Sequence, residues 1–328
     1  MSNKPKILVA RAIFPDQLAK LEESFEVRSN QADQVFTPEE LQKELSNVVG
    51  ALVTGSERID ASTLADAKSL KIVANIAVGY NNFDVPAITA AGVMASNTPG
   101  VLTDTTADFG FALLMATARR ITESEHWIRN GQWDQWSIVH NPLGMDLHHS
   151  TLGIIGMGRI GQGIAKRALG FGMKVIYHNR SRLPEADEKA CGATYVSKEE
   201  LLRTADHVVL VLPYTPQNHH TIGAKEIALM KPTATLVNIA RGGIVDDMAL
   251  AQALKEKKIF AAGLDVFEGE PKVNPELLKL SNIVLAPHIA SASEKTRRAM
   301  VDLAADNLRA ALAGQKPPSL INIELLKS

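Results

Sequence analysis

Three polar side chains in the C-terminal half of the sequence could together perform acid-base chemistry. Arg241 directly follows the apolar run LVNIA, Glu270 lies in the loop after GLDVF, and His288 follows IVLAP. Short apolar runs that alternate with helical patterns predict buried parallel strands, and ligands bind beyond the carboxyl ends of such strands. We therefore expect the guanidinium, the carboxylate and the imidazole to meet at one edge of a sheet.

This set of groups suits the reduction of a keto acid. The carbonyl oxygen gains negative charge when a hydride arrives and must then receive a proton, which a histidine can donate near neutral pH. A neighbouring carboxylate favours the charged imidazole, and an arginine can hold the substrate carboxylate or carbonyl in a planar, two-point grip. Taken singly, Arg241, Glu270 and His288 also fit a surface ion pair, a loop charge and a strand cap.

A carrier for the hydride is indicated by the stretch GIIGMGRIG. The spacing G-x-G-x-x-G falls on Gly156, Gly158 and Gly161, between an apolar strand and a helical run. The first glycine permits a tight turn, the second leaves room for a pyrophosphate, and the third lets helix and strand pack closely. The helix N-terminus, from Arg159 and Ile160 onward, would present free N–H groups to the phosphates. The stretch therefore predicts a dinucleotide site.

The residues after the next strand, KVIYH, bear on which dinucleotide binds. An acidic residue about 20 positions beyond the glycine turn would accept hydrogen bonds from the ribose 2′-hydroxyl of NAD. This chain instead has Asn179, Arg180, Ser181 and Arg182 there, which offer two guanidinium groups and a hydroxyl to a 2′-phosphate. The sequence favours NADP(H). The alternative is a solvated basic loop that accepts NAD(H) as well.

The same alternation of strands and helices runs through all 328 residues, a length typical of two domains. Strands are expected at 6–10, 49–53, 71–74, 151–156, 174–178, 207–212, 234–240, 260–266 and 283–287. Helical patterns cover 15–24, 38–46, 103–129 and 292–313, with stops at Asn130-Gly131 and at Gly314. This order predicts an α/β protein with doubly wound parallel sheets covered on both faces.

A loop-rich stretch at 131–150 interrupts the pattern. It contains Trp133, Trp136, Pro142 and Gly144, and it is expected to extend from the compact domain. Large aromatic side chains in such a segment are buried either against a partner chain or against the protein's own surface. The sequence leaves both interpretations open.

Composition excludes several classes of function. A net charge of −1 gives no sign of a nucleic-acid or membrane-surface partner, and no apolar run approaches the roughly 18 residues of a membrane span. The single cysteine, Cys191, fits a reducing, cytoplasmic setting.

Adjacent histidines at 148–149 and 219–220 should point in different directions, and no zinc-type spacing accompanies them, so we expect no metal site. Asp246-Asp247 is expected to cap a helix that starts near Met248.

Together these stretches resemble the D-isomer-specific 2-hydroxyacid dehydrogenase family. The matching segments, spread over most of the chain, are VGYNNFD, TPGVLTDTTAD, TLGIIGMGRIG, NIARGGIVDD, GLDVFEGEP and APHIASAS. In detail, LHHSTLGIIGMGRIG is similar to the glyoxylate/hydroxypyruvate reductase and 2-ketogluconate reductase branch.

The resemblance implies two doubly wound domains and an activity. A flavodoxin-like substrate domain would comprise 1–102 plus 290–328, and a Rossmann dinucleotide-binding domain 103–289, with a dimerisation arm at about 120–150 that joins a homodimer. The reaction would be NADPH-dependent reduction of glyoxylate, hydroxypyruvate or 2-ketogluconate to the D-2-hydroxy acid. Some relatives act as corepressors, so a dinucleotide-sensing interaction protein on the same fold is the alternative.

The resemblance also implies roles for matching residues. Arg241 would bind substrate, His288 would donate the proton, and Glu270 would pair with it; backbone N–H groups of Val78 and Gly79 would meet the substrate carboxylate. Besides Arg241 and His288, the cofactor would contact Thr106, Leu212, Pro213, Ile239, Ala240, Asp265 and Ala290. Ala290 stands where many relatives have glycine, which slightly narrows the room beside His288.

Overall fold

The computed structural model describes residues 4–326 and divides the chain into two compact units. One unit combines the residues up to Leu102 with those from Ala292 onward, and the other spans Thr103–Ser291. The chain thus leaves the first unit once and returns to it, and the return lies two residues beyond the boundary expected at 290.

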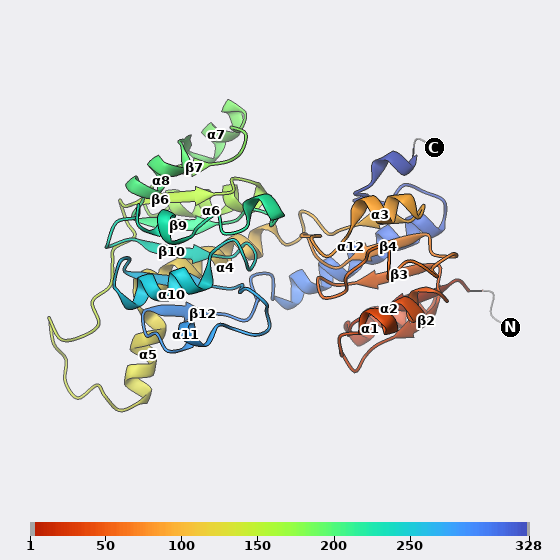
Figure 1. Cartoon of the computed structure of the whole chain (residues 1–328), viewed down its shortest axis with the longest axis horizontal. Coiled ribbons are helices and arrows are strands. Elements are labelled where there is room, and N and C mark those ends of the chain that lie inside the picture. Colours follow the sequence, from red (N-terminus) through yellow and green to blue (C-terminus); the bar gives the residue numbers. More distant parts are fainter. Residues whose placement is uncertain (1–3, 327–328) are drawn as a thin grey trace. The chain divides into compact units, whose positions relative to one another are not determined.

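The first unit contains a parallel sheet with the strand order β2-β1-β3-β4-β5. Its strands are β1 (Lys6–Val9), β2 (Glu26–Ser29), β3 (Gly50–Val53), β4 (Ile72–Asn75) and β5 (Met94–Ser96). Its helices are α1 (Pro15–Glu22), α2 (Pro38–Leu45), α3 (Val85–Ala90) and α12 (Glu294–Leu312), with a 3-10 turn at Ile323–Leu326. The long helix α12 contacts β3 and β4, so the end of the chain covers the sheet built by its beginning (Figure 1).

The second unit contains a parallel sheet with the order β12-β11-β10-β9-β6-β7-β8. Its strands are β6 (Thr151–Ile155), β7 (Lys174–His178), β8 (Ala193–Tyr195), β9 (His207–Leu210), β10 (Thr235–Asn238), β11 (Ala261–Leu264) and β12 (Ile283–Leu285). Its helices are α4 (Thr103–Ala118), α5 (Ile121–Arg129), α6 (Arg159–Leu169), α7 (Glu185–Cys191), α8 (Lys198–Thr204), α9 (Ala224–Ile227), α10 (Asp247–Lys255) and α11 (Pro275–Leu278), with a 3-10 turn at Pro216–Asn218.

The strand order of the second sheet contains a topological switch point. The chain winds outward from β6 through β7 to β8, then returns to place β9 on the other side of β6. The carboxyl ends of β6 and β9 therefore face a topological switch point, where open α/β sheets bind ligands. Apolar clusters line both faces of this sheet. The predicted α/β class with two parallel sheets is confirmed.

The helical pattern at 103–129 is two helices, so the prediction of one was wrong. Helix α4 ends at Ala118, and Arg120 adopts a left-handed conformation with φ of 53° before α5 begins. The returning chain stabilises the break: Met145 N–H donates to the Ala118 carbonyl at 2.8 Å, and a Cβ on Gly144 would lie 2.6 Å from that oxygen. Asn130 and Gly131 end α5, as predicted.

Three short strands were missed by the sequence pattern. β2 is largely exposed, while β5 and β8 have only three residues each and so give no readable alternation. All three lie at sheet edges. The other strands fall within a few residues of their expected bounds. Among residues 4–326, no helix is both long and apolar enough to span a bilayer.

Candidate active site

The imidazole of His288 and the carboxylate of Glu270 lie against each other in the second unit. His288 Nδ1 is 2.8 Å from Glu270 Oε1. Burial opposes ionisation of Glu270, but the hydrogen bond and charge of His288, together with the Phe267 N–H and Arg241, lower its pKa. The carboxylate is thus ionised at neutral pH and accepts the Nδ1 proton. This leaves His288 Nε2 as the nitrogen that can exchange a proton with a ligand.

The backbone of His288 is fixed in an uncommon conformation by Asp265. His288 has φ of 54°, and its N–H donates to the Asp265 carbonyl at 2.9 Å. The buried Asp265 carboxylate accepts from Ile289 N–H at 2.8 Å and from Ala290 N–H at 2.9 Å. Burial raises the pKa of Asp265 despite those two bonds. Asp265 therefore holds the turn that orients the imidazole.

Arg241 follows β10 directly and sits at the same edge of the sheet. Its guanidinium donates to the Ala240 carbonyl at 2.8 Å, and Asn238 holds the turn by donating to the Arg241 carbonyl and accepting from Ala240 N–H. Burial lowers the pKa of Arg241, while the charges of Glu270 and Asp265 raise it. The two carboxylates keep the half-buried guanidinium charged, so its N–H groups can donate to an anionic ligand.

The turn that carries Arg241 and the loop that carries Glu270 pack closely at a glycine, Gly242. A Cβ placed on Gly242 would lie 1.8 Å from the carbonyl oxygen of Phe267. Only a residue without a side chain can sit there, next to Arg241, while the loop of Glu270 passes so close. The structure therefore brings Arg241, Glu270 and His288 to one edge of the sheet, as the strand-end argument predicted.

The glycine turn after β6 has the geometry that a pyrophosphate requires. Gly156 has φ of 104° and lies against the backbone of Leu212, where a Cβ would be 2.7 Å from its nitrogen. A Cβ on Gly161 would be 2.4 Å from the Gly156 carbonyl oxygen, whereas nothing lies within 4 Å of a Cβ on Gly158. Helix α6 begins at Arg159, so its N-terminal N–H groups face this open space. These residues fit a dinucleotide.

Several residues expected to contact the cofactor lie beside this turn. Leu212 and Pro213 follow β9, the strand next to β6, and Ile239 and Ala240 follow β10. Thr106 on α4 is buried, and its hydroxyl finds no hydrogen-bond partner among the described residues. A buried unpaired hydroxyl points to a ligand atom as its partner. The contacts themselves stay a prediction.

The segment after β7 differs in part from expectation. Asn179 Oδ1 accepts from Met157 N–H at 2.7 Å and so joins this segment to the glycine turn. Arg180 and Ser181 are exposed. Arg182, in contrast, donates from Nε and Nη2 to the carboxylate of Glu188 at 2.8 and 2.7 Å. The two arginines expected to meet a 2′-phosphate therefore stand in different environments.

In the first unit, the loop after β4 presents backbone N–H groups. Asn97 donates to the Val78 carbonyl at 2.8 Å, and Asn75 donates to the Gly79 carbonyl at 3.0 Å. No hydrogen bond within residues 4–326 uses the N–H of Val78 or Gly79. Their predicted role toward the substrate carboxylate stays a prediction.

Comparison with known proteins agrees with the fold. The description "D-isomer specific 2-hydroxyacid dehydrogenase, NAD binding domain" applies to the family whose sequence model matches residues 111–290. The chain is 48% identical to a glyoxylate reductase of Thermococcus kodakarensis over 99% of this chain and 98% of that protein. This chain belongs to the D-isomer-specific 2-hydroxyacid dehydrogenase family.

Solved structures similar to this chain show the same fold. An NADPH-dependent glyoxylate/hydroxypyruvate reductase from Sinorhizobium meliloti, crystallised with NADP and malonate, has a TM-score of 0.86 at 34% identity and covers 98% of this chain and 97% of its own. A Thermus thermophilus protein has a TM-score of 0.89 at 42% identity and covers 96% of this chain and 99% of its own. The resemblance noted in the sequence is therefore confirmed over the whole length.

One histidine pair in this family member departs from expectation. His219 and His220 follow a 3-10 turn rather than lying on a regular element, and their rings are stacked with centroids 3.8 Å apart and planes at 24°. The expectation that they point apart was wrong. His220 Nε2 bonds Glu268 Oε1 at 2.6 Å. A ring nitrogen of each histidine and a carboxylate oxygen of Glu268 lie within 4.8 Å of one another, so these three side chains could hold a metal ion. The absence of a metal stays a prediction.

One positioning role in this family member, that of Asp247, was not visible in the sequence. Asp246 caps α10 by accepting from Ala249 N–H, as predicted, but Asp247 is buried and accepts from Glu268 N–H at 3.1 Å instead. Burial raises the pKa of Asp247 to about 6. Asp247 thus anchors the loop that carries Glu270. The only signal in the sequence was a polar residue beside a helix start, which capping already explained.

Proposed function

We propose that the protein is an NADPH-preferring reductase that converts a small 2-keto acid, namely glyoxylate, hydroxypyruvate or 2-ketogluconate, into the D-2-hydroxy acid. The observation that carries this proposal is the contact of His288 with Glu270 at 2.8 Å, on the sheet edge that also bears Arg241 and the glycine turn. The names of the similar proteins, glyoxylate reductase and glyoxylate/hydroxypyruvate reductase, support the substrate class.

The proton needed by the substrate would come from His288. The ionised Glu270 accepts the Nδ1 proton, which fixes the tautomer and orients the ring, so that Nε2 carries the proton given to the carbonyl oxygen. When bound, the nicotinamide supplies the hydride. Proton transfer leaves a neutral imidazole, which recovers its proton from solvent because its side chain is 44% exposed.

The substrate would be oriented by Arg241 and by backbone N–H groups. The planar guanidinium of Arg241 fits two oxygens of a 2-keto acid at once. The family resemblance implies that the N–H groups of Val78 and Gly79 receive the substrate carboxylate. A 2-keto acid has its carboxylate next to the reacting carbonyl, which is why donors to both groups raise selectivity for this class.

The choice of NADPH rests on the segment that follows β7. It contains no carboxylate between Asn179 and Arg182 that would repel a 2′-phosphate, and it exposes Arg180 and Ser181. The cocrystal of the Sinorhizobium meliloti relative with NADP supports this preference. Because the same glycine turn serves both dinucleotides, NAD(H) is expected to bind more weakly rather than not at all.

A substrate panel tests the proposal directly. With purified protein, loss of NADPH absorbance is measured with glyoxylate, hydroxypyruvate and 2-ketogluconate, and then with NADH in place of NADPH. We expect turnover with at least one acid and a kcat/KM for NADPH at least about 10-fold above that for NADH. No turnover with any of the three would remove the reductase proposal and favour the dinucleotide-sensing alternative. Equal values for the two cofactors would remove only the preference.

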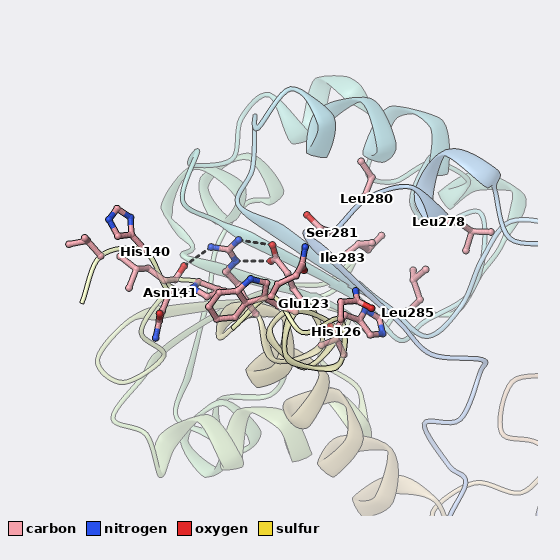
Figure 2. A pocket seen from close by; sticks show the side chains of 17 residues that line it. Glu123, His126, His140, Asn141, Leu278, Leu280, Ser281, Ile283 and Leu285 are labelled. Atoms are coloured by element: carbon pink, nitrogen blue, oxygen red, sulfur yellow. Dashed lines mark hydrogen bonds and ion pairs between the residues drawn. The ribbon is translucent and has the colours of Figure 1, made fainter. Parts of the chain in front are cut away.

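We further propose that the enzyme is a homodimer joined through the segment at about 120–150. In the second unit, a groove of about 940 Å³ lies between α5 and the β12 side of the sheet, with apolar side chains at its wall from Leu278, Leu280, Ile283 and Leu285 (Figure 2). Arg120 holds this segment by bonding Glu123 and the Leu143 carbonyl. The lining is thus ordered without a partner.

The apolar residues of this segment are left uncovered by the rest of the chain. Trp133 and Trp136 are 50% and 72% exposed, and Ile138, Val139 and Leu143 are exposed as well. Packing against the protein's own surface therefore does not bury the two tryptophans. A second copy that brings the same segment into the groove would cover them, and such a two-fold contact needs only one self-complementary surface.

The variant Trp136→Glu tests the dimer. A charge in the contact should raise the dimer dissociation constant at least about 30-fold, the effect of losing a tryptophan anchor. Sedimentation velocity should find the unaltered protein at twice the 35.4 kDa chain mass and the variant shifted toward the monomer. Val35→Glu, which alters a 57% exposed apolar side chain outside the segment, is the control. A monomeric unaltered protein, or a dimeric Trp136→Glu variant, would contradict the contact.

A further inference from the structure

The segment Asn179–Leu183 is held at both ends by buried groups. At its start, Asn179 Oδ1 accepts from Met157 N–H, and its carbonyl accepts from the Tyr195 hydroxyl at 3.3 Å. At its end, Leu183 N–H donates to the Tyr177 hydroxyl at 2.8 Å. Tyr177 lies on β7 and is completely buried. The conformation of the segment is therefore set before any ligand arrives.

The carboxylate of Glu188 on α7 joins Tyr177 and Arg182, and we call these three side chains the clamp. Glu188 is only 7% exposed and accepts three bonds, from the Tyr177 hydroxyl at 2.6 Å and from Arg182 Nε and Nη2 at 2.8 and 2.7 Å. These bonds lower the pKa of Glu188 to about 2, with Arg182 the larger cause, while burial and Glu188 raise the pKa of Tyr177 to about 12. The clamp thus keeps one charge state at every pH used to assay the protein.

Although the Arg182 side chain is 64% exposed, its partner Glu188 is mostly buried, so moving Arg182 away from Glu188 carries an electrostatic cost. The Arg182 guanidinium neutralises Glu188, and moving it to a ligand phosphate would leave that mostly buried carboxylate with the Tyr177 hydroxyl as its one remaining side-chain partner and without its counter-charge, which is unfavourable. Arg180 and Ser181 stand between the two anchored ends, and neither side chain takes part in a hydrogen bond or ion pair within residues 4–326. They are the groups of this segment that remain available to an anion.

We propose that Glu188 determines cofactor specificity as a positioning residue: by clamping Arg182 it fixes the segment so that Arg180 and Ser181 meet the 2′-phosphate of NADPH. This inference rests on the proposed preference for NADPH. An ordered segment loses less conformational entropy when it binds, so the clamp strengthens a contact that Glu188 itself does not make. Arg182 acts through the segment rather than on the phosphate.

The test measures binding without turnover. Isothermal titration of the full-length protein gives dissociation constants for 5′-AMP and 2′,5′-ADP. The ratio of the constant for 5′-AMP to that for 2′,5′-ADP reports recognition of the 2′-phosphate alone. Arg180→Ala should lower the ratio about 10-fold or more, the effect of losing a charge-assisted hydrogen bond. Glu188→Gln and Arg182→Ala should each lower it a few-fold. The double variant should be no worse than either, because the two residues act as one unit.

The control is Glu185→Gln, which alters a carboxylate on the same helix. Glu185 pairs with Lys189 at 2.6 Å, and both side chains are 76% exposed, so the ratio should not change. Tyr177→Phe provides a second way to weaken the clamp and should act in the same direction as Glu188→Gln. Hydrogen exchange at the Leu183 N–H should speed up in Glu188→Gln and Tyr177→Phe but not in the control.

Each outcome separates the clamp from the cofactor proposal. A ratio near one in the unaltered protein would overturn the NADPH preference, and the specificity role with it. A high ratio that Glu188→Gln leaves unchanged or raises would overturn the role of Glu188 alone. A loss in Arg182→Ala as large as that in Arg180→Ala would show that Arg182 contacts the phosphate directly, which also overturns the inference.

Discussion

His288→Asn is expected to lower kcat for keto-acid reduction about 10²- to 10⁴-fold, the usual contribution of a positioned general acid. Asparagine suits this position because His288 has φ of 54°, and asparagine tolerates left-handed backbone better than most residues. Its amide can still bond Glu270, so the turn is kept while the titratable proton is lost. Steady-state kinetics with NADPH and the best keto acid measure the change.

Two further measurements distinguish a loss of proton transfer from damage to the structure. The dissociation constant for NADPH, followed by nucleotide fluorescence without substrate, should change by less than about 3-fold if His288 acts in proton transfer rather than in folding. His148→Asn replaces an exposed histidine outside the Glu270 pair and should leave kcat unchanged. Full activity in His288→Asn would contradict the acid role, and a common loss of activity and NADPH binding would point to a damaged structure instead.

The position of the chemical groups was predictable because strand ends are predictable. Arg241, Glu270 and His288 each come after a buried strand of one sheet, and parallel strands bring the residues beyond their carboxyl ends to a single edge. The glycine turn was readable because local geometry requires it: Gly156 has φ of 104°, and Gly161 lies against the Gly156 carbonyl inside one strand-turn-helix unit. The first argument depends on the repeated strand-helix alternation, and the second depends on residues that are close together in sequence.

Contacts set by the rotation of a helix or by a returning chain were not predictable. Arg182 meets Glu188 because α7 turns that side chain inward, and sequence spacing alone does not distinguish Glu188 from Glu185, which is exposed. The end of α4 at Ala118 depends on the backbone near Gly144, which returns from a loop of more than ten residues. In each case the deciding partner is identified only by the folded arrangement.

Arg241→Lys should raise KM for the keto acid about 10- to 100-fold, with a smaller effect on kcat. Lysine keeps a positive charge but offers a single ammonium in place of the two parallel N–H donors, and one charge-assisted hydrogen bond accounts for an effect of this size. Burial, which already lowers the pKa of Arg241, will lower that of a lysine there further, so the variant is expected to recover affinity as the pH falls. Initial rates at saturating NADPH over a range of pH values measure both effects.

Arg203→Lys, which alters a 57% exposed arginine paired with Glu199, is the matched control. An unchanged KM in Arg241→Lys would mean that the substrate carboxylate is bound by other donors, such as the N–H groups after β4, and that Arg241 serves the dinucleotide or the loop instead.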